Sequence, residues 1–285
     1  MIAKANGSGR PSAHRHRRRL TGTSGLRQLF EERRERDALY GTAPYWDARA
    51  SARAGMARSL WPSNAFNQLW DERQRTLLDR ALGDIQGRHV LDVGCGTGRM
   101  TRWLAEEREA GRVVGVDFSA DTVEAAQAES AALVSSGIVK FVQGDVVAGL
   151  DSVGVEAFDD ALVLGCLSVA CRDRAALATA IGNVARRVRK GGRVLLLEPI
   201  HRSPLLRRIL DLGIEDWVAC ANAAGLSLIF ADRMGFVPVR LLLSVRDVPR
   251  SVLAPAFDAG EHLLDRLPWL APLSDYKLLL FTRNG

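Results

Sequence analysis

The sequence predicts an α/β protein built on a mostly parallel, doubly wound sheet. Five short apolar runs, each of strand length, follow one another between residues 88 and 198, and stretches with helical spacing separate them. A cluster of three glycines comes directly after the first of these runs. Alternation of strands and helices favours parallel pairing, with helices on both faces of the sheet.

The expected elements can be placed along the chain by residue number. Strands are expected at 88–93, 112–116, 138–143, 158–164 and 193–198, with helices over 97–110, 119–136 and 173–190, the last ending at its glycines. Beyond residue 200 we expect helices over 214–226 and 251–267, extended chain in two pieces over 226–245 and a closing strand over 276–283. Before the first strand, a helix over 26–41 precedes an aromatic-rich helical segment with breaks near Pro44 and Pro62.

The net charge of +6 is concentrated in the first twenty residues. They hold six basic residues and no acidic one, which leaves 33 basic and 33 acidic residues for the remainder. The arm is either a solvated tail or a contact for nucleic acid or another anionic surface. Because the remainder is neutral, the sequence favours the solvated tail, and nucleic acid is not an expected partner.

Cysteine and histidine usage indicates no disulfide framework and no metal site. The four cysteines form no C-x-x-C pair, and the five histidines show no metal-ligand spacing. No apolar run is long enough to cross a membrane, and the first residues have no apolar signal segment. We therefore expect a cytoplasmic protein with free thiols and without bound metal.

The glycine cluster lies in "VLDVGCGTGRM", residues 90–100. A glycine loop between a strand and its helix presents backbone N–H groups to a ligand. The spacing is G-x-G-x-G, because Arg99 and Thr101 stand where a dinucleotide fingerprint needs its third glycine. No G-K-[ST] follows either, so the spacing excludes a P-loop.

This segment resembles the first motif of the class I S-adenosylmethionine (SAM)-dependent methyltransferases. Asp117 in "VVGVDFSADTVEAA" and Asp145 in "FVQGDVV" agree with the second and third strand ends of that family, and "FDDALVLGCLSVA" and "VRKGGRVLLLEP" agree with its fourth and fifth strands. The resemblance covers residues 75–200 well. It implies a Rossmann-like seven-stranded sheet with an N-terminal helical lid and an insertion before the last strand.

The resemblance also implies SAM as the cofactor and assigns residues to it. It places Asp117 on the ribose hydroxyls, which a carboxylate can accept together, and Asp145 on the adenine amino group. Gly94 and Gly96 give the methionine end room, and Gly98 allows the helix to pack closely on the strand. Asp92 supplies negative charge near the cationic groups. The full set expected at the cofactor is Tyr45, Trp46, Asp92, Gly94, Cys95, Gly96, Gly98, Asp117, Phe118, Gly144, Asp145, Val146 and Gly165.

The acceptor side is less clearly marked in the sequence. His201, three residues after Glu198, is the expected catalytic base, or else a surface histidine beside a loop. Arg202, Arg207 and Arg208 would hold an anionic substrate or form a solvated helix face. In relatives, elements such as "PYWDARA" come from a helix that closes over the methionine end, so Tyr45 and Trp46 are expected there. The aromatic residues between 61 and 70 line a lid or simply pack in a core.

These observations predict three regions and a function. The regions are a disordered basic arm (1–25), a helical lid (26–75) and a methyltransferase domain (76–285) with a substrate-shaping insertion around 203–274. We expect methyl transfer to O, N or C of a small, largely apolar or aromatic metabolite in specialised metabolism. The alternatives are an RNA or protein methyltransferase that uses the arm, and a cyclase or SAM-binding protein that transfers no methyl group. The sequence is compatible with a homo-oligomer and does not determine the oligomeric state.

Overall fold

The computed structural model describes residues 40–52, 56, 61, 63–154, 157–201, 210–244 and 248–285, with the backbone alone for 49–52. The chain divides into two units, Met1–Arg36 and Asp37–Gly285, and every described residue belongs to the second. The basic arm, the expected helix over 26–41 up to residue 39, Pro62 and the three arginines at 202–208 lie outside the described residues. The expectations made for them stay predictions.

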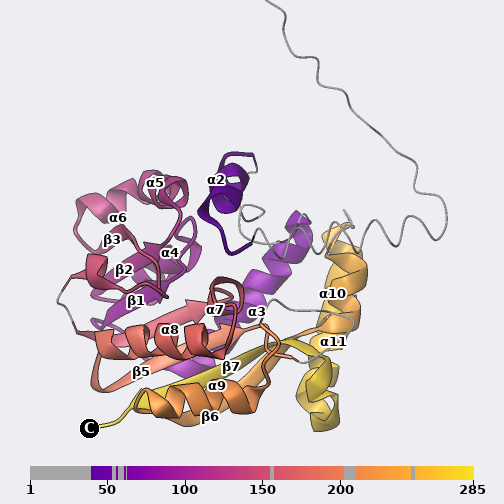
Figure 1. Ribbon diagram of the computed structural model, residues 1–285. Coiled ribbons are helices and arrows are strands. Elements are labelled where there is room, and N and C mark those ends of the chain that lie inside the picture. The colour runs from indigo at the N-terminus through magenta and orange to yellow at the C-terminus, as the bar shows by residue number, and fades with distance from the viewer. Residues whose placement is uncertain are drawn as a thin grey trace, which may run out of the picture. The chain divides into compact units, whose positions relative to one another are not determined.

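The second unit is built on one seven-stranded sheet (Figure 1). Its strands are β1 (His89–Val93), β2 (Arg112–Asp117), β3 (Val139–Gln143), β4 (Phe158–Leu164), β5 (Val188–Glu198), β6 (Leu226–Phe236) and β7 (Ser274–Arg283). Their order in the sheet is β3-β2-β1-β4-β5-β7-β6. The first five pair in parallel, whereas β7 runs antiparallel to both β5 and β6. The predicted α/β class and the mostly parallel seven-stranded sheet are confirmed.

Helices cover both faces of the sheet, as the sequence predicts. The helices are α2 (Ala43–Ala52), α3 (Asn64–Leu82), α4 (Arg99–Glu106), α5 (Ala120–Glu129), α6 (Ala131–Ser135), α7 (Leu167–Ala170), α8 (Arg174–Arg187), α9 (Ile214–Ala223), α10 (Val237–Leu243) and α11 (Arg250–Arg266), with 3-10 turns η2 (Asp151–Val153) and η3 (Pro268–Leu273). None of the described helices is long and apolar enough to cross a membrane.

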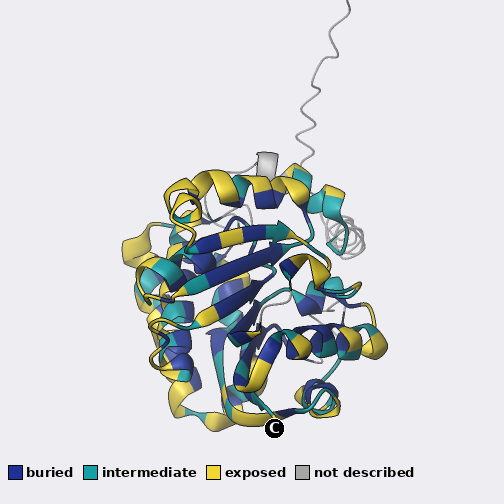
Figure 2. Ribbon diagram, turned by 90° about the vertical axis from the view of Figure 1, so that its left-hand side faces the viewer, coloured by how far each residue is buried: buried dark blue, intermediate teal, exposed yellow. Residues whose placement is uncertain are grey.

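The sheet separates two apolar cores, and alternate residues of β1 point into one or the other. Leu91 and Val93 of β1 pack with α8 and α9 on one face, while Val90 packs with α3, α4 and α11 on the other. This two-residue period is what a strand covered on both faces requires. Figure 2 shows the buried strands between helices whose outer surfaces are exposed. Because both faces of the sheet are packed, the ends of its strands hold their side chains in defined positions.

Several helices begin at capping residues that the sequence supplies. Ser63, Ser119 and Asp173 each accept a backbone N–H of the first turn, of α3, α5 and α8 respectively. The helix α4 begins differently, because it follows Gly98 in the left-handed conformation, with φ of 78°. A Cβ at Gly98 would also come within 2.7 Å of the Phe141 ring on β3. The glycine therefore allows the close packing that the sequence predicts there.

Two expectations about elements are wrong. The strand β5 begins at Val188 rather than 193, because the chain continues through Gly191 and Gly192 past a register shift opposite Phe158 and Asp160. The second extended piece expected after β6 is the helix α10. There Pro238 occupies the first turn, a position that proline tolerates, and Arg240 is turned inward. The helix α11, by contrast, matches its prediction although Pro255 lies within it.

Candidate cofactor site

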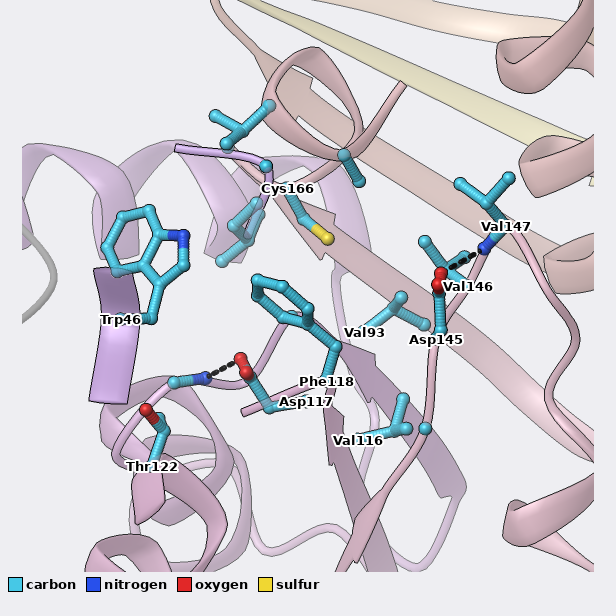
Figure 3. Close-up of a pocket in the computed structure, with 18 of the residues that line it drawn as sticks. Trp46, Val93, Val116, Asp117, Phe118, Thr122, Asp145, Val146, Val147 and Cys166 are labelled. Atoms are coloured by element: carbon cyan, nitrogen blue, oxygen red, sulfur yellow. Dashed lines mark hydrogen bonds between the residues drawn. The ribbon is translucent and has the colours of Figure 1, made fainter. Parts of the chain in front are cut away.

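A cavity of about 280 Å³ opens at the carboxyl ends of the parallel strands (Figure 3). Its lining residues come from α2 and the turn before it, the ends of β1, β2 and β4, the loops that follow β1, β2, β3 and β4, and the helices α5 and α7. They are Tyr40, Gly41, Trp46, Val93, Gly94, Gly96, Thr97, Val116, Asp117, Phe118, Thr122, Gly144, Asp145, Val146, Val147, Leu164, Gly165, Cys166, Val169 and Ala170. In open α/β sheets this edge is where ligands bind.

Nine of the thirteen residues expected at the cofactor line this cavity. They are Trp46, Gly94, Gly96, Asp117, Phe118, Gly144, Asp145, Val146 and Gly165. The other four lie outside the lining. Tyr45 packs its ring on Tyr40 and Trp46, with centroids 4.8 and 5.2 Å away. Cys95 and Gly98 face Gly115 and Phe141 at the packing side of the loop.

Asp92, the fourth of these, is 2% exposed and turned away from the cavity. Its Oδ2 accepts the hydroxyl of Thr101 on α4 at 2.6 Å. Burial raises the pKa of its carboxyl to about 6, against the Thr101 hydrogen bond and the charge of Arg99, which lower it. Asp92 therefore ties β1 to α4, and any effect on a ligand would be through space.

The Asp117 carboxylate forms the polar floor of the cavity. Its Oδ2 accepts the N–H of Gly96 at 3.0 Å and its Oδ1 accepts the N–H of Ser119 at 3.1 Å. Burial raises the pKa of this carboxyl, whereas the N–H groups of Ser119 and Gly96 lower it and the nearby charge of Asp47 raises it. Both oxygens keep a second acceptor site, so the group can take hydrogen bonds from a ligand.

The loop after β3 forms another side of the cavity. The Oδ1 atom of Asp145 accepts the N–H of Val147 at 2.8 Å and that of Ala148 at 3.4 Å. The neighbouring Gly144 has no room for a side chain, because a Cβ there would lie 2.6 Å from the Ser152 hydroxyl and 2.9 Å from Val116. The loop is thus held close to the end of β2 and presents Asp145, Val146 and Val147 to the cavity.

The helix α2 covers the cavity at the side of Asp117. The Trp46 indole lies over Phe118 and Thr122 in Figure 3, and its N–H donates to the carbonyl of Tyr40 at 2.6 Å. Asp47, the next residue, accepts the hydroxyl of Ser119. This contact fastens α2 to the residue that both caps α5 and donates to Asp117.

The wall formed by the β4–α7 segment lies directly on the glycine loop. A Cβ at Gly94 would come within 2.6 Å of the Cys166 Cβ and 2.7 Å of its sulfur. The wall therefore occupies the space that a side chain at Gly94 would need. Burial raises the pKa of the Cys166 thiol well above its usual value, with the charge of Glu198 adding to the effect, so the group is a neutral apolar lining atom at pH 7.

His201 does not line the cavity. Its side chain is buried, and Nε2 lies 3.3 Å from Oδ1 of Asp275, which is itself inaccessible. The second oxygen of Asp275 lies 2.7 Å from Nε of Arg240 on α10. The histidine is therefore not a surface residue, and it belongs to a buried polar group at the end of β5. Tyr276, next to Asp275, brings its hydroxyl within 3.2 Å of the Cβ position of Gly165 at the cavity wall.

Sequence reasoning missed several lining residues. Thr97 and Thr122, and Val93 and Val116, follow directly from the loop and strand ends that it located, so their positions alone would have indicated them. Tyr40, Gly41 and Cys166 reach the cavity only through the packing of α2 and of the β4–α7 segment. No local sequence pattern predicts that packing.

The family model and two curated proteins that match this chain are methyltransferases. Residues 90–192 match a methyltransferase domain. An O-methyltransferase of Penicillium expansum is 33% identical over 137 residues, which cover 46% of this chain and 47% of that protein. An O-methyltransferase of Pyrenophora dematioidea is 30% identical over 171 residues, 59% of this chain and 58% of that protein. The chain thus spans about half the length of the curated relatives it matches.

Solved structures of methyltransferases have a similar fold. The N-methyltransferase NodS of Bradyrhizobium japonicum, in complex with S-adenosyl-L-homocysteine (SAH), superposes with a TM-score of 0.58 over 86% of this chain and all of that one. The two sequences are 14% identical, so the likeness concerns the fold.

Proposed function

Residues 90–192 make this chain a member of the class I SAM-dependent methyltransferases, and on that premise we propose that it methylates a small, largely apolar or aromatic metabolite. SAM is the cofactor of this family. The observation that carries the proposal is the Asp117 carboxylate at the floor of a strand-end cavity, joined to a glycine loop. Oxygen is the favoured acceptor atom, because two of the curated relatives, those of Penicillium expansum and Pyrenophora dematioidea, are O-methyltransferases.

The residues present suit SAM as the ligand. Asp117 has acceptor capacity for the two ribose hydroxyls, and Asp145 with the backbone of Val146 would meet the adenine ring. The loop at Gly94 and Gly96 leaves room for the methionine end. When bound, SAM supplies an electrophilic methyl group on a sulfonium. The chain would supply alignment of an acceptor with that methyl and exclusion of water.

An aromatic cluster supports an apolar acceptor. The ring centroid of Trp70 on α3 lies 4.6 Å from that of Trp61 and 5.1 Å from that of Tyr276 on β7. Phe66 lies 5.7 Å from Phe257 on α11. Because Tyr276 reaches Gly165, these rings extend from the cavity wall to the helices between β6 and β7. Phe66, Trp70 and Phe257 are buried and pack the core, whereas Trp61 and Tyr276 are only partly buried, so these two rings support contact with an apolar ligand.

His201 stays the proposed general base, and because it does not line the cofactor cavity, it would act on an acceptor bound outside that cavity. An O–H acceptor must lose a proton as the methyl group is transferred, and a histidine near neutral pH takes one readily. Asp275 lies on Nε2 and Arg240 fixes Asp275, so the ring is held in one orientation. The proton would pass from the acceptor oxygen to the imidazole. An amine acceptor would bind as the neutral base and need this step less.

The proposal is tested by incubating the protein with SAM and a panel of phenols, carboxylic acids, amines and activated carbon acids. Mass spectrometry then measures the methylated products and SAH. Formation of SAH with a small apolar acceptor is the expected result. Methylation of RNA or a peptide instead would favour the polymer alternative. SAM binding without SAH formation from any acceptor would favour a cyclase or binding protein.

We further propose a cytoplasmic protein that acts in biosynthesis, as in natural-product pathways. The four cysteines are free thiols, which suits a reducing compartment. An assembly of identical subunits is compatible with the exposed Leu242, Val252 and Trp269 on α10, α11 and η3. Size-exclusion chromatography with light scattering would measure the mass in solution.

A further inference from the structure

Glu198, the last residue of β5, is fully buried, and its carboxylate binds three successive backbone N–H groups. Oε1 accepts from Cys166 at 2.8 Å and from Leu167 at 2.9 Å, and Oε2 accepts from Ser168 at 3.2 Å. Buried N–H groups must be paired, and here one side chain from the neighbouring strand pairs all three. The carboxylate thereby fixes the path of the chain where β4 ends and α7 begins.

That stretch of chain is the wall of the cavity described above. Gly165, Cys166, Val169 and Ala170 line the cavity, and Cys166 also abuts Gly94 of the glycine loop (Figure 3). Glu198 itself is not a lining residue, because it binds the wall from the side of the sheet. Glu198 would therefore not touch a bound ligand, and it would affect that ligand only through the position of this backbone.

The ionised form of Glu198 suits all three donors best, because both of its oxygens carry negative charge. A carboxylate is an acceptor at every lone pair, whereas a protonated carboxyl carries one O–H donor. A glutamine carries an NH₂ group in place of one oxygen, so it would turn a donor toward at least one backbone N–H. Loss of one such acceptor frees the wall from a defined position.

We propose that Glu198 is a positioning residue for the cofactor cavity, whose ionised carboxylate holds residues 165–170 where SAM binds against them. The inference rests on the proposed SAM site. It adds a residue that supports the wall of this site without lining it. It also makes cofactor affinity depend on the charge of a group that the cofactor does not touch. SAM and SAH would then bind more tightly as pH rises from 6 to 8.

Glu198 changes its charge within the pH range of the proposed effect. Burial raises the pKa of this carboxyl to about 7, against hydrogen bonds from Ser168, Leu167 and Cys166 that lower it. The neighbouring ionisable groups are the thiols of Cys166 and Cys171 and the amine of Lys277, the register partner of Glu198 on β7, and the same strand also carries Asp275 and Tyr276. Both thiols have raised pKa values and stay neutral at pH 6–8.

Lys277 and His201 are directed to other partners. The Lys277 ammonium donates to the carbonyl of Ser274 at 2.6 Å and to its hydroxyl at 2.5 Å. His201, three residues beyond Glu198, lies against Asp275. Within the described chain, Glu198 is thus the carboxylate that binds this wall.

The test measures SAH affinity of the whole protein by calorimetry at pH 6, 7 and 8. For the wild type we expect an affinity about tenfold higher at pH 8 than at pH 6. Glu198→Gln should bind about tenfold more weakly than the wild type at pH 8 and lose most of this pH dependence. Glu198→Asp, which keeps the charge, should retain the pH dependence at reduced affinity.

Glu261→Gln is the matched control. Glu261 is also a buried glutamate whose carboxylate accepts two backbone N–H groups, those of Gly235 and Phe236, but it lies on α11 and does not line the cavity. This variant should match the wild type in SAH affinity within twofold at each pH. Thermal unfolding of every variant, with and without SAH, separates loss of folding from loss of the wall.

Two results would overturn the inference: tight SAH binding by Glu198→Gln at pH 8, or equal pH dependence in that variant and the wild type. The wild-type profile requires no variant, and a flat profile from pH 6 to 8 would also overturn it. Because binding of SAH needs no acceptor, failure to find a methylated product leaves this test intact. A wild type that binds no SAH would overturn both this inference and the proposed cofactor site.

Discussion

Gly96 donates its backbone N–H to Oδ2 of Asp117 at 3.0 Å, so the loop after β1 and the acid that ends β2 form one hydrogen-bonded unit. The acid therefore has two tasks, to orient the loop and to accept hydrogen bonds from a ligand. A change at Asp117 consequently alters both the ligand contacts and the loop.

Asp117→Ala should weaken SAM binding by about 1–3 kcal/mol, because hydroxyls of the ligand would be buried without their acceptor. Calorimetry with SAM measures the change. Asp121→Ala is the control, since Asp121 is exposed in the first turn of α5 and does not line the cavity. Equal affinity of Asp117→Ala and the wild type would show that Asp117 is misassigned.

Trp46→Ala should lower SAM affinity about tenfold, because the indole covers the cavity beside Phe118 and Thr122. Trp269→Ala, which removes a 72% exposed indole from η3, should leave the affinity unchanged. Titration of both variants with SAM compares them directly. A loss of affinity at Trp269 and none at Trp46 would reverse the assignment of α2 as the cover.

His201→Ala should reduce turnover by about 10²–10⁴ while the affinity for SAM changes little, because a general base acts on the acceptor. Steady-state rates with a small-molecule acceptor, measured beside SAM affinity, provide the comparison. His262→Ala, at an exposed position on α11, serves as the control. Undiminished turnover would remove His201 as the base.

Deletion of residues 1–20 should leave methylation of a small molecule unchanged, because all the excess positive charge lies in that segment and the described lining residues all lie beyond it. The initial rates of the full chain and the shortened chain are compared at low ionic strength, where charge effects are largest. Activity on RNA or a peptide that vanishes with the deletion would support the polymer alternative.

The free energy of unfolding should fall as pH rises from about 4.5 to 7. Over this range the folded protein keeps a proton on Glu198, whose pKa is raised to about 7, while the unfolded chain releases it. Each pH unit is worth about 1.4 kcal/mol, so ionising this group costs the fold about 3 kcal/mol. Asp92, with a pKa of about 6, acts in the same direction over a lower range.

Urea unfolding at pH 5, 6, 7 and 8 measures this dependence. Glu198→Gln should show a smaller fall in the free energy of unfolding than the wild type, because its buried group does not titrate. Identical curves for the two proteins would mean that Glu198 is ionised throughout the range. Combined with the SAH measurements, this shows whether one carboxylate lowers stability and raises affinity at the same pH.

Sequence alone predicts the parts of this protein that local pattern governs. The parallel strands and the loop at Gly94–Gly98 follow from hydrophobic period and from glycine spacing, and the acid at Asp117 follows from the resemblance to the methyltransferase family. The helix α10 does not, because "VPVRLLL" has no polar alternation and reads equally as buried strand. Burial of Arg240 against Asp275, which is distant in sequence, decides between the two.

The candidate site divides in the same way. Residues that follow a strand end, such as Asp117 and Asp145, can be located from sequence. The contacts of Glu198 and His201 cannot, since each depends on which strand neighbours β5 in the sheet. Strand order is a property of the whole chain, and single-strand patterns do not encode it.

The position of β7 has a consequence for the order of assembly. It follows β6 in the chain yet lies between β5 and β6, and β6 pairs with no other strand among the described residues. Until β7 has been synthesised, the edge of β5 is open and β6 has no place in the sheet. Contacts so distant in sequence slow folding, and an open edge strand invites pairing between chains. Nascent or truncated chains that lack residues 274–283 should therefore aggregate through β5.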